Sequence, residues 1–228
     1  MSQSYILRLT EQVKPKRSEV IAMNERFYEL PEEKQHSVLN AAMEVFATND
    51  YKRASTDLIA AKSGVSKGLL FYYFHNKKEL YLAVYEYARR VITEGVADSR
   101  LLEITDFFDL ISYAAMKKIG IMIENPYILD FAVRSFYSEK EEVSDALKAT
   151  NSNAVEEIYG QYFRNIDFSK FRDGADPYYL LRMLIWMTDG YLHEQQMYRR
   201  SLCLADIEKE LVKWTKLLKQ IAYREKYL

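Results

Sequence analysis

Apolar residues recur every three or four positions along most of the chain, which is the period of an amphipathic α-helix. In the first organised segment, Leu39, Ala42, Met43 and Phe46 keep this spacing after Pro31. The proline suits the first turn of a helix, and a polar cluster over 48–50 indicates where that helix ends. The sequence shows no sustained period-two alternation that would predict strands. The pattern therefore predicts an all-α fold.

The residues after position 54 predict two short helices joined by a tight turn. Ser55 or Thr56 is placed to cap the first of them. Gly64 can end it in the left-handed conformation, which glycine adopts without strain. Ser66 is then placed to cap a second helix over residues 67–74. A helix, a glycine turn and a short second helix make up the layout of a helix-turn-helix.

The rest of the chain also predicts helices. Asn76, with Glu79 three residues later, has the spacing of a capping box and indicates the start of a fourth helix. Asn125 and Asp176 precede prolines and mark boundaries, because the residue before a proline is pushed out of the helical region. We expect further helices over residues 104–124, 126–138, 140–165, 176–200 and 204–227, with a loop over 168–175.

Composition agrees with this picture. Hydrophobic residues make up 49% of the 228 residues, and the seven glycines and four prolines leave room for long helices. The single cysteine, Cys203, excludes an intrachain disulfide and fits a reducing compartment. No segment has the pattern of a signal peptide or the length of a membrane span. We therefore expect a cytoplasmic protein with no membrane partner.

Charge is distributed unevenly, although the net charge is only −1. Residues 52–78 contain six cationic residues and one anionic residue, which is a local balance of +5. Such a basic patch suits a phosphate-binding surface, because local potential steers an anion more than total charge does. An ordinary solvated surface has the same composition, so charge alone leaves both interpretations open.

The run STDLIAAKSGVSKGLLFYYFHNKKEL over residues 55–80 resembles the DNA-binding signature of the TetR family, and the similarity covers roughly residues 31–90. The resemblance implies an N-terminal three-helix helix-turn-helix DNA-binding domain over 31–78. It also implies a C-terminal helical bundle for ligand binding and dimerisation over 79–228. Residues 1–30 would form an N-terminal extension, either a poorly ordered segment or a basic arm that reaches DNA.

The resemblance also implies which residues contact DNA. Thr56 corresponds to a residue whose hydroxyl and amide hold a phosphate. Lys67 and Gly68 correspond to the first residues of the recognition helix, which face base edges. Tyr72 and Tyr73 correspond to an aromatic pair that packs on the sugar-phosphate backbone. The full expected set is Ser55, Thr56, Ser66, Lys67, Gly68, Leu69, Tyr72, Tyr73 and Lys77.

Some of these positions admit a purely structural role. Lys77 corresponds to a phosphate-binding cation at the start of the fourth helix, but Lys77 and Lys78 could equally be solvated. Tyr72 and Tyr73 could be packing residues. Phe71 departs from the family pattern, since many members carry tyrosine there. Phenylalanine cannot make the hydroxyl contact, so we assign Phe71 to the core.

The second half holds many large apolar side chains at helical spacing. They could form a plain core, or they could line an apolar cavity with a few hydroxyl donors. The resemblance implies an effector bound within this bundle. The side chains favour an apolar or aromatic small molecule, and no cofactor is expected. The expected lining is Tyr113, Met116, Phe131, Tyr159, Phe163, Met183 and Trp186.

The last two expected helices carry long apolar stripes. Two such helices from each subunit would form a four-helix interface, unless the stripes pack only within their own chain. In a homodimer, two recognition helices about 34–36 Å apart would read half-sites one helical turn apart. The expected interface residues are Leu180, Leu184, Met187, Tyr191, Ile207, Leu211, Trp214 and Leu218.

The sequence favours a transcriptional regulator, most simply a repressor that an effector releases from its operator. An enzyme is not expected, because the three histidines show no metal-ligand spacing, Cys203 has no evident base partner and no glycine-rich phosphate loop is present. No metal site is expected either. A helical interaction module that has lost DNA binding is a third possibility, against which the lysines over 62–78 argue.

Overall fold

A computed structural model describes residues 25–137, 143, 159–160, 162–198 and 200–228. Within these ranges the protein is helical, and the extended pairing is limited to a single bridge between Phe171 and Tyr223. This result confirms the predicted all-α fold. The helix expected over 140–165 lies almost wholly outside the described residues, as do residues 1–24 of the expected N-terminal arm.

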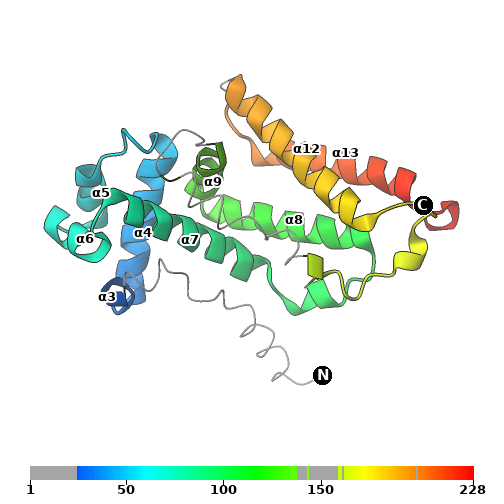
Figure 1. Ribbon diagram of the computed structural model, residues 1–228, viewed down its shortest axis with the longest axis horizontal. Helices are drawn as coiled ribbons and strands as arrows, with labels where there is room; N and C mark the ends of the chain where they lie inside the picture. Colours follow the sequence, from blue (N-terminus) through cyan, green and yellow to red (C-terminus); the bar gives the residue numbers. More distant parts are fainter. Residues whose placement is uncertain (1–24, 138–142, 144–158, 161, 199) are drawn as a thin grey trace. The chain divides into compact units, whose positions relative to one another are not determined.

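The chain forms two compact units (Figure 1). The first contains residues 1–91 and 127–147, and the second contains residues 92–126 and 148–228. Described elements of the first unit are α3 (Glu25–Tyr28), α4 (Glu32–Thr48), α5 (Thr56–Ser63), α6 (Lys67–Phe74), most of α7 (Lys77–Val96) and α9 (Tyr127–Tyr137). Those of the second are the 3-10 helix η1 (Ser99–Leu102), α8 (Phe107–Glu124), η2 (Phe168–Lys170), α12 (Pro177–Met197), α13 (Leu204–Ala222) and η3 (Glu225–Tyr227).

The first unit extends beyond the helix-turn-helix region. Helix α9 packs against α4, and the ring of Phe131 lies 5.2 Å from that of Tyr81, which in turn lies 4.8 Å from that of Phe46. The Tyr81 hydroxyl and the Ser135 hydroxyl are hydrogen-bonded at 2.9 Å. Residues through 91 and α9 thus pack as one unit with residues 31–78. The functional division expected at residue 78 stays a prediction.

The second unit is built around a cluster of aromatic rings. Phe107 is fully buried, with its ring 5.2 Å from that of Phe163 and 5.4 Å from that of Phe171. Tyr223 is also fully buried, 4.9 Å from Phe171. Offset and edge-on ring pairs of this kind add to the stability that burial of apolar area supplies. The cluster therefore ties the start of α8 to the chain that follows α13.

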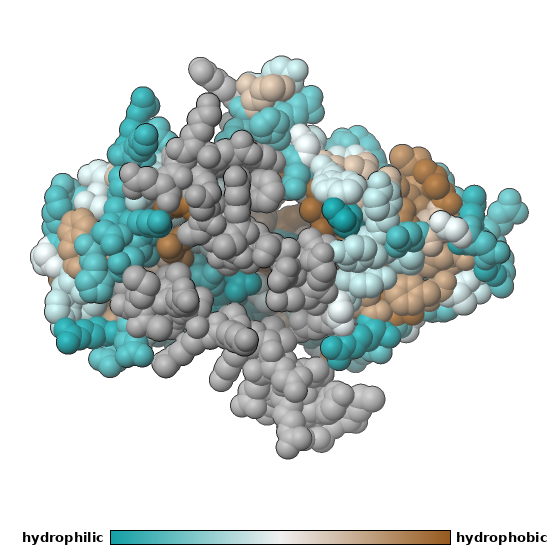
Figure 2. Space-filling model, viewed as in Figure 1, coloured by the Kyte–Doolittle hydropathy of each residue, from teal (hydrophilic) through white to brown (hydrophobic). Residues whose placement is uncertain are grey.

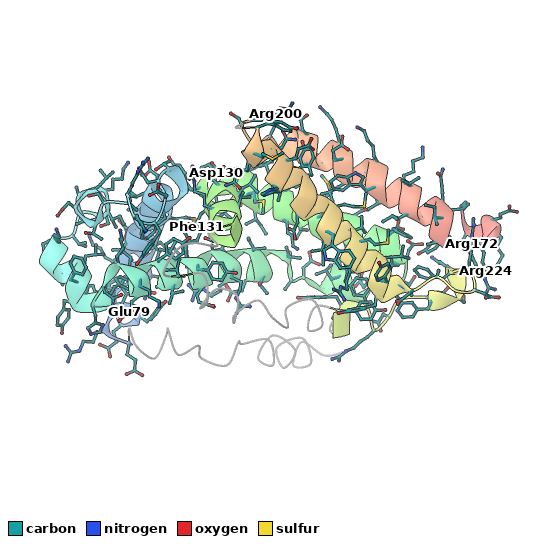
Figure 3. The ribbon with its side chains drawn as sticks, turned by 45° about the horizontal axis from the view of Figure 1, so that its top comes forward. Glu79, Asp130, Phe131, Arg172, Arg200 and Arg224 are labelled. Carbon is teal, nitrogen blue, oxygen red and sulfur yellow. The ribbon has the colours of Figure 1, made fainter. Side chains whose placement is uncertain are left out.

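Two arginines join the segment after η2 to the end of α13, and both lie at the same end of the second unit (Figure 3). Arg172 donates from Nε to the Tyr223 carbonyl at 2.5 Å. Arg224 donates from Nε to the Phe171 carbonyl at 2.8 Å, and its Nη2 reaches Asp173 at 2.8 Å. Residues 168–175, expected as a loop, contain η2 and the bridge, and these long-range bonds hold them to the end of α13.

Helices α8 and α13 have boundaries that differ from the sequence prediction. Helix α8 begins at Phe107 and not at 104, because the Asp106 side chain accepts hydrogen bonds from the amides of Phe108 and Asp109. Helix α13 ends at Ala222 and not at 227, because Tyr223 is extended and pairs with Phe171. The described helices include none long and apolar enough to cross a membrane.

Asp106 connects three elements of the second unit. Its carboxylate caps α8 and lies 2.9 Å from Lys170 Nζ and 3.6 Å from Lys219 Nζ. Burial by itself would raise the pKa of the Asp106 carboxyl. The hydrogen bonds from Lys170 and from the Asp109 amide, with the charge of Lys219, outweigh burial and hold this pKa below its ordinary value. The ionised form is therefore the one that the fold stabilises.

We expect Asp106→Asn to lower the free energy of unfolding by about 2–3 kcal/mol at neutral pH, because it breaks a mostly buried ion pair and weakens a helix cap. Since the folded pKa is depressed, the contribution of Asp106 is complete above its unfolded pKa of about 3.9 and is lost as pH falls through the folded value. Urea unfolding of both proteins across this acid range would measure it.

Asp173→Asn is the matched control, because Asp173 also forms an ion pair, with Arg224, but its side chain is 99% exposed. We expect it to change stability by less than about 0.5 kcal/mol. Equal losses for the two variants, or a difference between wild type and Asp106→Asn that does not shrink in acid, would contradict this account.

Candidate nucleic-acid interface

The segment from Ser55 to Phe74 forms the predicted helix-turn-helix. The Ser55 hydroxyl accepts a hydrogen bond from the Leu58 amide at 3.3 Å, and the Ser66 hydroxyl accepts one from the Leu69 amide at 3.1 Å. These bonds satisfy amides that the first turn of a helix leaves unpaired. Both helix starts agree with the sequence prediction.

Gly64 makes the turn between the two helices. Its φ of +68° is left-handed, and an added Cβ would meet nothing within 4 Å. The requirement for glycine is therefore conformational and not steric. The amide of Val65 then donates to the Ala60 carbonyl at 3.2 Å, which closes the end of α5.

Helix α6 has one buried and one exposed face. Leu70 and Phe74 are each only 1% exposed, so they anchor the helix in the first unit. Tyr72 is 52% exposed and Leu69 is 39% exposed. The other exposed members of the expected DNA-contact set are Ser55, Ser66, Lys67 and Gly68, whereas Thr56, Tyr73 and Lys77 are half-buried. Because α6 packs through its other side, most of the expected contact residues are accessible.

Ion pairs hold two of the lysines near this surface. Lys67 Nζ lies 2.9 Å from Asp57 Oδ1, and both side chains are more than half exposed. Lys62 Nζ lies 3.0 Å from Glu44 Oε1. An exposed pair of this kind is weak, so a phosphate or a base edge could replace Asp57 at little cost. Lys67 is therefore available as a donor at the first position of α6.

Lys77 has a structural role in addition to any contact with DNA. Its ammonium donates to the carbonyl oxygens of Lys52 at 3.1 Å and Ala54 at 3.4 Å, and it lies 4.7 Å from the ring centroid of Tyr51. These contacts fasten the start of α7 to the segment before α5. One of the three ammonium protons remains for another acceptor. Neighbouring Lys78 is exposed.

Sequence reasoning missed a link between α9 and the helix-turn-helix. The Tyr127 hydroxyl donates to Glu44 Oε1 at 3.0 Å, the same oxygen that Lys62 approaches. The hydrogen bonds from Lys62 and Tyr127 lower the pKa of the Glu44 carboxyl. Arg134 of α9 also donates to the Ala47 carbonyl at 2.5 Å. No local signal could reveal these contacts, because they join residues more than 80 positions apart.

The expected effector-lining residues fall in different places. Phe131, labelled in Figure 3, belongs to the core of the first unit, whereas the other six belong to the second. Phe163 is buried in the aromatic cluster, and the ring of Tyr159 stacks on it at 4.8 Å. Trp186 is 47% exposed and Met116 is 46% exposed. Tyr113 and Met183 are half-buried. We therefore leave Phe131 out of an effector site in the second unit, and the lining role stays a prediction for the other six residues.

The expected dimer residues divide between a buried and a partly buried group. Leu180, Leu184, Ile207 and Leu218 are buried within the described part of their own chain. Met187, Tyr191, Leu211 and Trp214 are half-buried, and the rings of Tyr191 and Trp214 lie 6.0 Å apart. Part of each stripe thus packs within its own chain. A role in dimerisation stays a prediction for the partly buried group.

Comparison with known proteins agrees with the fold and the site. Residues 38–84 match the family described as "Bacterial regulatory proteins, tetR family". The chain is 34% identical over 119 residues to the HTH-type transcriptional activator FasR of Mycolicibacterium smegmatis. That match covers 47% of this chain and 53% of FasR, so it spans only about half the length of the curated relative.

Solved structures share the fold at low sequence identity. The fatty acid degradation regulator FadR from Bacillus halodurans has a TM-score of 0.63 at 17% identity, covering 80% of this chain and 96% of that one. FadR from Bacillus subtilis, in complex with stearoyl-CoA, has a TM-score of 0.60 at 17% identity, covering 78% and 96%. Over the residues that the structure describes, the fold and the site define a helical protein with a helix-turn-helix. The matched segment, residues 38–84, is similar to the TetR family.

We expect Gly64→Ala to lower the free energy of unfolding by about 1 kcal/mol or more, because alanine is strained at positive φ. Gly120→Ala is the matched control: it lies within α8, and its added Cβ also meets nothing within 4 Å. We expect that change to stabilise the protein by up to about 1 kcal/mol. Chemical unfolding would compare them, and equal effects would refute a conformational role for Gly64.

Proposed function

We propose that this protein is a sequence-specific, DNA-binding transcriptional regulator whose contact surface is the exposed face of α6 together with the start of α5. The observation that carries the proposal is the placement of Lys67 and Tyr72 on the accessible side of a short helix whose other side is buried. A helix displayed in this way can enter the major groove, about 12 Å wide. Ser55, Thr56, Tyr73 and Lys77 would contact the flanking backbone.

Binding as a homodimer follows from the same proposal, because two copies of α6 are needed to read two half-sites. The evidence that supports a homodimer comes from helices α12 and α13. Apolar side chains gather on the surface of the second unit (Figure 2), and Val212, Leu217 and Ile221 of α13 are each more than half exposed. A second subunit covering this face would bury apolar area that water otherwise contacts.

The sign of regulation has two candidates. Release of a repressor by an effector is the simpler scheme, and it needs only an effector that prefers the DNA-incompetent state. The curated relative FasR is described as an activator, which favours activation as the second candidate. Operator position relative to the promoter would separate the two schemes, since the contact surface is the same in both.

We propose that the effector is a small molecule with a long apolar chain, bound in the second unit. FadR of Bacillus subtilis binds stearoyl-CoA, so long-chain acyl-CoA is the first class to examine. Helix α7 begins in the first unit and ends in the second, and α9 is hydrogen-bonded to α4. An effector that displaced the part of α7 in the second unit would therefore act, through the same helix, on the unit that carries α6.

The experiment that tests DNA binding uses Lys67→Gln. The wild type is offered a random pool of duplexes, and binding to the selected duplex is measured by fluorescence anisotropy. We expect Lys67→Gln to lose about 1–3 kcal/mol of discrimination against mismatched sites, because a long cationic donor to base edges is replaced by a shorter, neutral amide. Lys209→Gln is the matched control, since Lys209 forms the same kind of exposed lysine–aspartate pair, with Asp206 of α13 at 3.0 Å.

Failure of the wild type to select any sequence would refute the regulator and favour an interaction module. Equal effects of Lys67→Gln and Lys209→Gln would refute the assignment of the contact surface, even if DNA binding itself were observed.

For the effector, we expect stearoyl-CoA to raise the melting temperature of the protein and to change its affinity for the selected duplex by about tenfold, which corresponds to about 1.4 kcal/mol of preference between two states. Coenzyme A without an acyl chain is the control and should do neither. A change in melting temperature without any change in DNA affinity would refute the proposal that this ligand regulates DNA binding.

A further inference from the structure

A short element before the helix-turn-helix is fixed to the recognition helix. Helix α3 precedes α4 and ends before residues 38–84, which match the family. Its Phe27 is fully buried, with its ring 4.6 Å from that of Phe74 and 5.7 Å from that of Tyr73. Because Phe74 is also the buried anchor of α6, the two elements share one apolar contact.

Hydrogen bonds from α4 hold the backbone that follows α3. Gln35 Nε2 donates to the carbonyl oxygens of Tyr28 at 3.1 Å and Leu30 at 2.8 Å. Carbonyl groups at the end of a helix lack partners within the helix, so these bonds satisfy groups that would otherwise need water. The position of α3 is thus set by both its side chains and its backbone.

This anchoring places Arg26 on the exposed side of α6. The Arg26 guanidinium carbon lies 5.2 Å from the ring centroid of Tyr72, and Nη1 donates to the Tyr72 hydroxyl. Both side chains are exposed. Stacking on an aromatic ring orients a guanidinium without using its hydrogen-bond donors, and four of the five N–H groups remain after the bond to Tyr72.

Arg26 differs from the lysines nearby. Lys67 and Lys62 pair with Asp57 and Glu44, whereas the structure, over the residues that it describes, gives Arg26 no carboxylate partner. An oriented guanidinium without a carboxylate suits a phosphate, which it can hold through two parallel hydrogen bonds. Tyr72 belongs to the surface proposed above to contact DNA, so a backbone phosphate of a bound duplex would lie within reach of Arg26.

We propose that Arg26 is a DNA-phosphate contact supplied from outside the helix-turn-helix, with Tyr72 as the residue that orients it. The inference rests on the proposed function, and it assigns Arg26 to affinity and not to sequence reading. A phosphate contact carries no base information, so its loss weakens binding to all duplexes alike. Phe27 is a positioning residue in this scheme, because it holds the segment that carries Arg26.

The test measures the salt dependence of binding to the duplex that the wild type selects. We expect Arg26→Gln to reduce the slope of log affinity against log salt by about 1 for each bound subunit, and to weaken binding about fivefold, with unchanged discrimination between matched and mismatched sites. Arg26→Lys, which keeps the charge, should retain most of the slope. Phe27→Ala should reproduce part of the effect, if its melting curve shows that it folds.

Arg200→Gln is the matched control. Arg200 contacts exposed Tyr198 in the second unit, with its guanidinium carbon 5.1 Å from the ring centroid. The substitution Arg200→Gln should therefore leave the salt slope unchanged. A double-mutant cycle of Arg26→Gln with Tyr72→Ala then tests orientation: the effect of Arg26→Gln should shrink when the ring is absent.

The outcomes separate the two proposals. If the wild type selects no duplex, both fall. If Lys67→Gln loses discrimination while Arg26→Gln keeps the wild-type slope, the regulator stands and the Arg26 contact is refuted. If Arg26→Gln changes discrimination and not the slope, Arg26 reads bases, and its assignment as a phosphate contact is wrong.

Discussion

Burial of one face of α6 is the constraint on which the rest of the structure depends. Eight residues are too few for a helix that is stable by itself in water, so α6 exists because packing holds it. Leu70 and Phe74 supply that packing, and their position on the helix determines which side chains face outward. Lys67 and Tyr72 are thus exposed because Leu70 and Phe74 are buried on the other side of α6.

Local chemistry explains why this part could be predicted from the sequence. The two serine caps act on amides three residues away, and the left-handed turn requires only that Gly64 lack a Cβ. Each of these signals lies within one or two helical turns, so a single sequence contains all of the information.

Long-range contacts explain what the sequence could not show. Phe27 lies within a stretch expected to be an extension or arm, and its partners Tyr73 and Phe74 are more than 40 residues away. Tyr223 ends α13 early because it pairs with Phe171. Phe131 appeared to be one of several pocket aromatics, yet it packs against Tyr81 in the first unit. Helical spacing predicts that such residues are buried, but it does not predict which partner buries them.

Hydrogen–deuterium exchange with and without the selected duplex tests the central claim most directly. Bound DNA should slow exchange at the amides of residues 66–73 and at the start of α5, because these groups would be covered or would bond to phosphate oxygens. Amides of α12 and α13 serve as the internal reference. Protection confined to that reference region, with residues 66–73 unchanged, would contradict the assignment of α6 as the surface that contacts DNA.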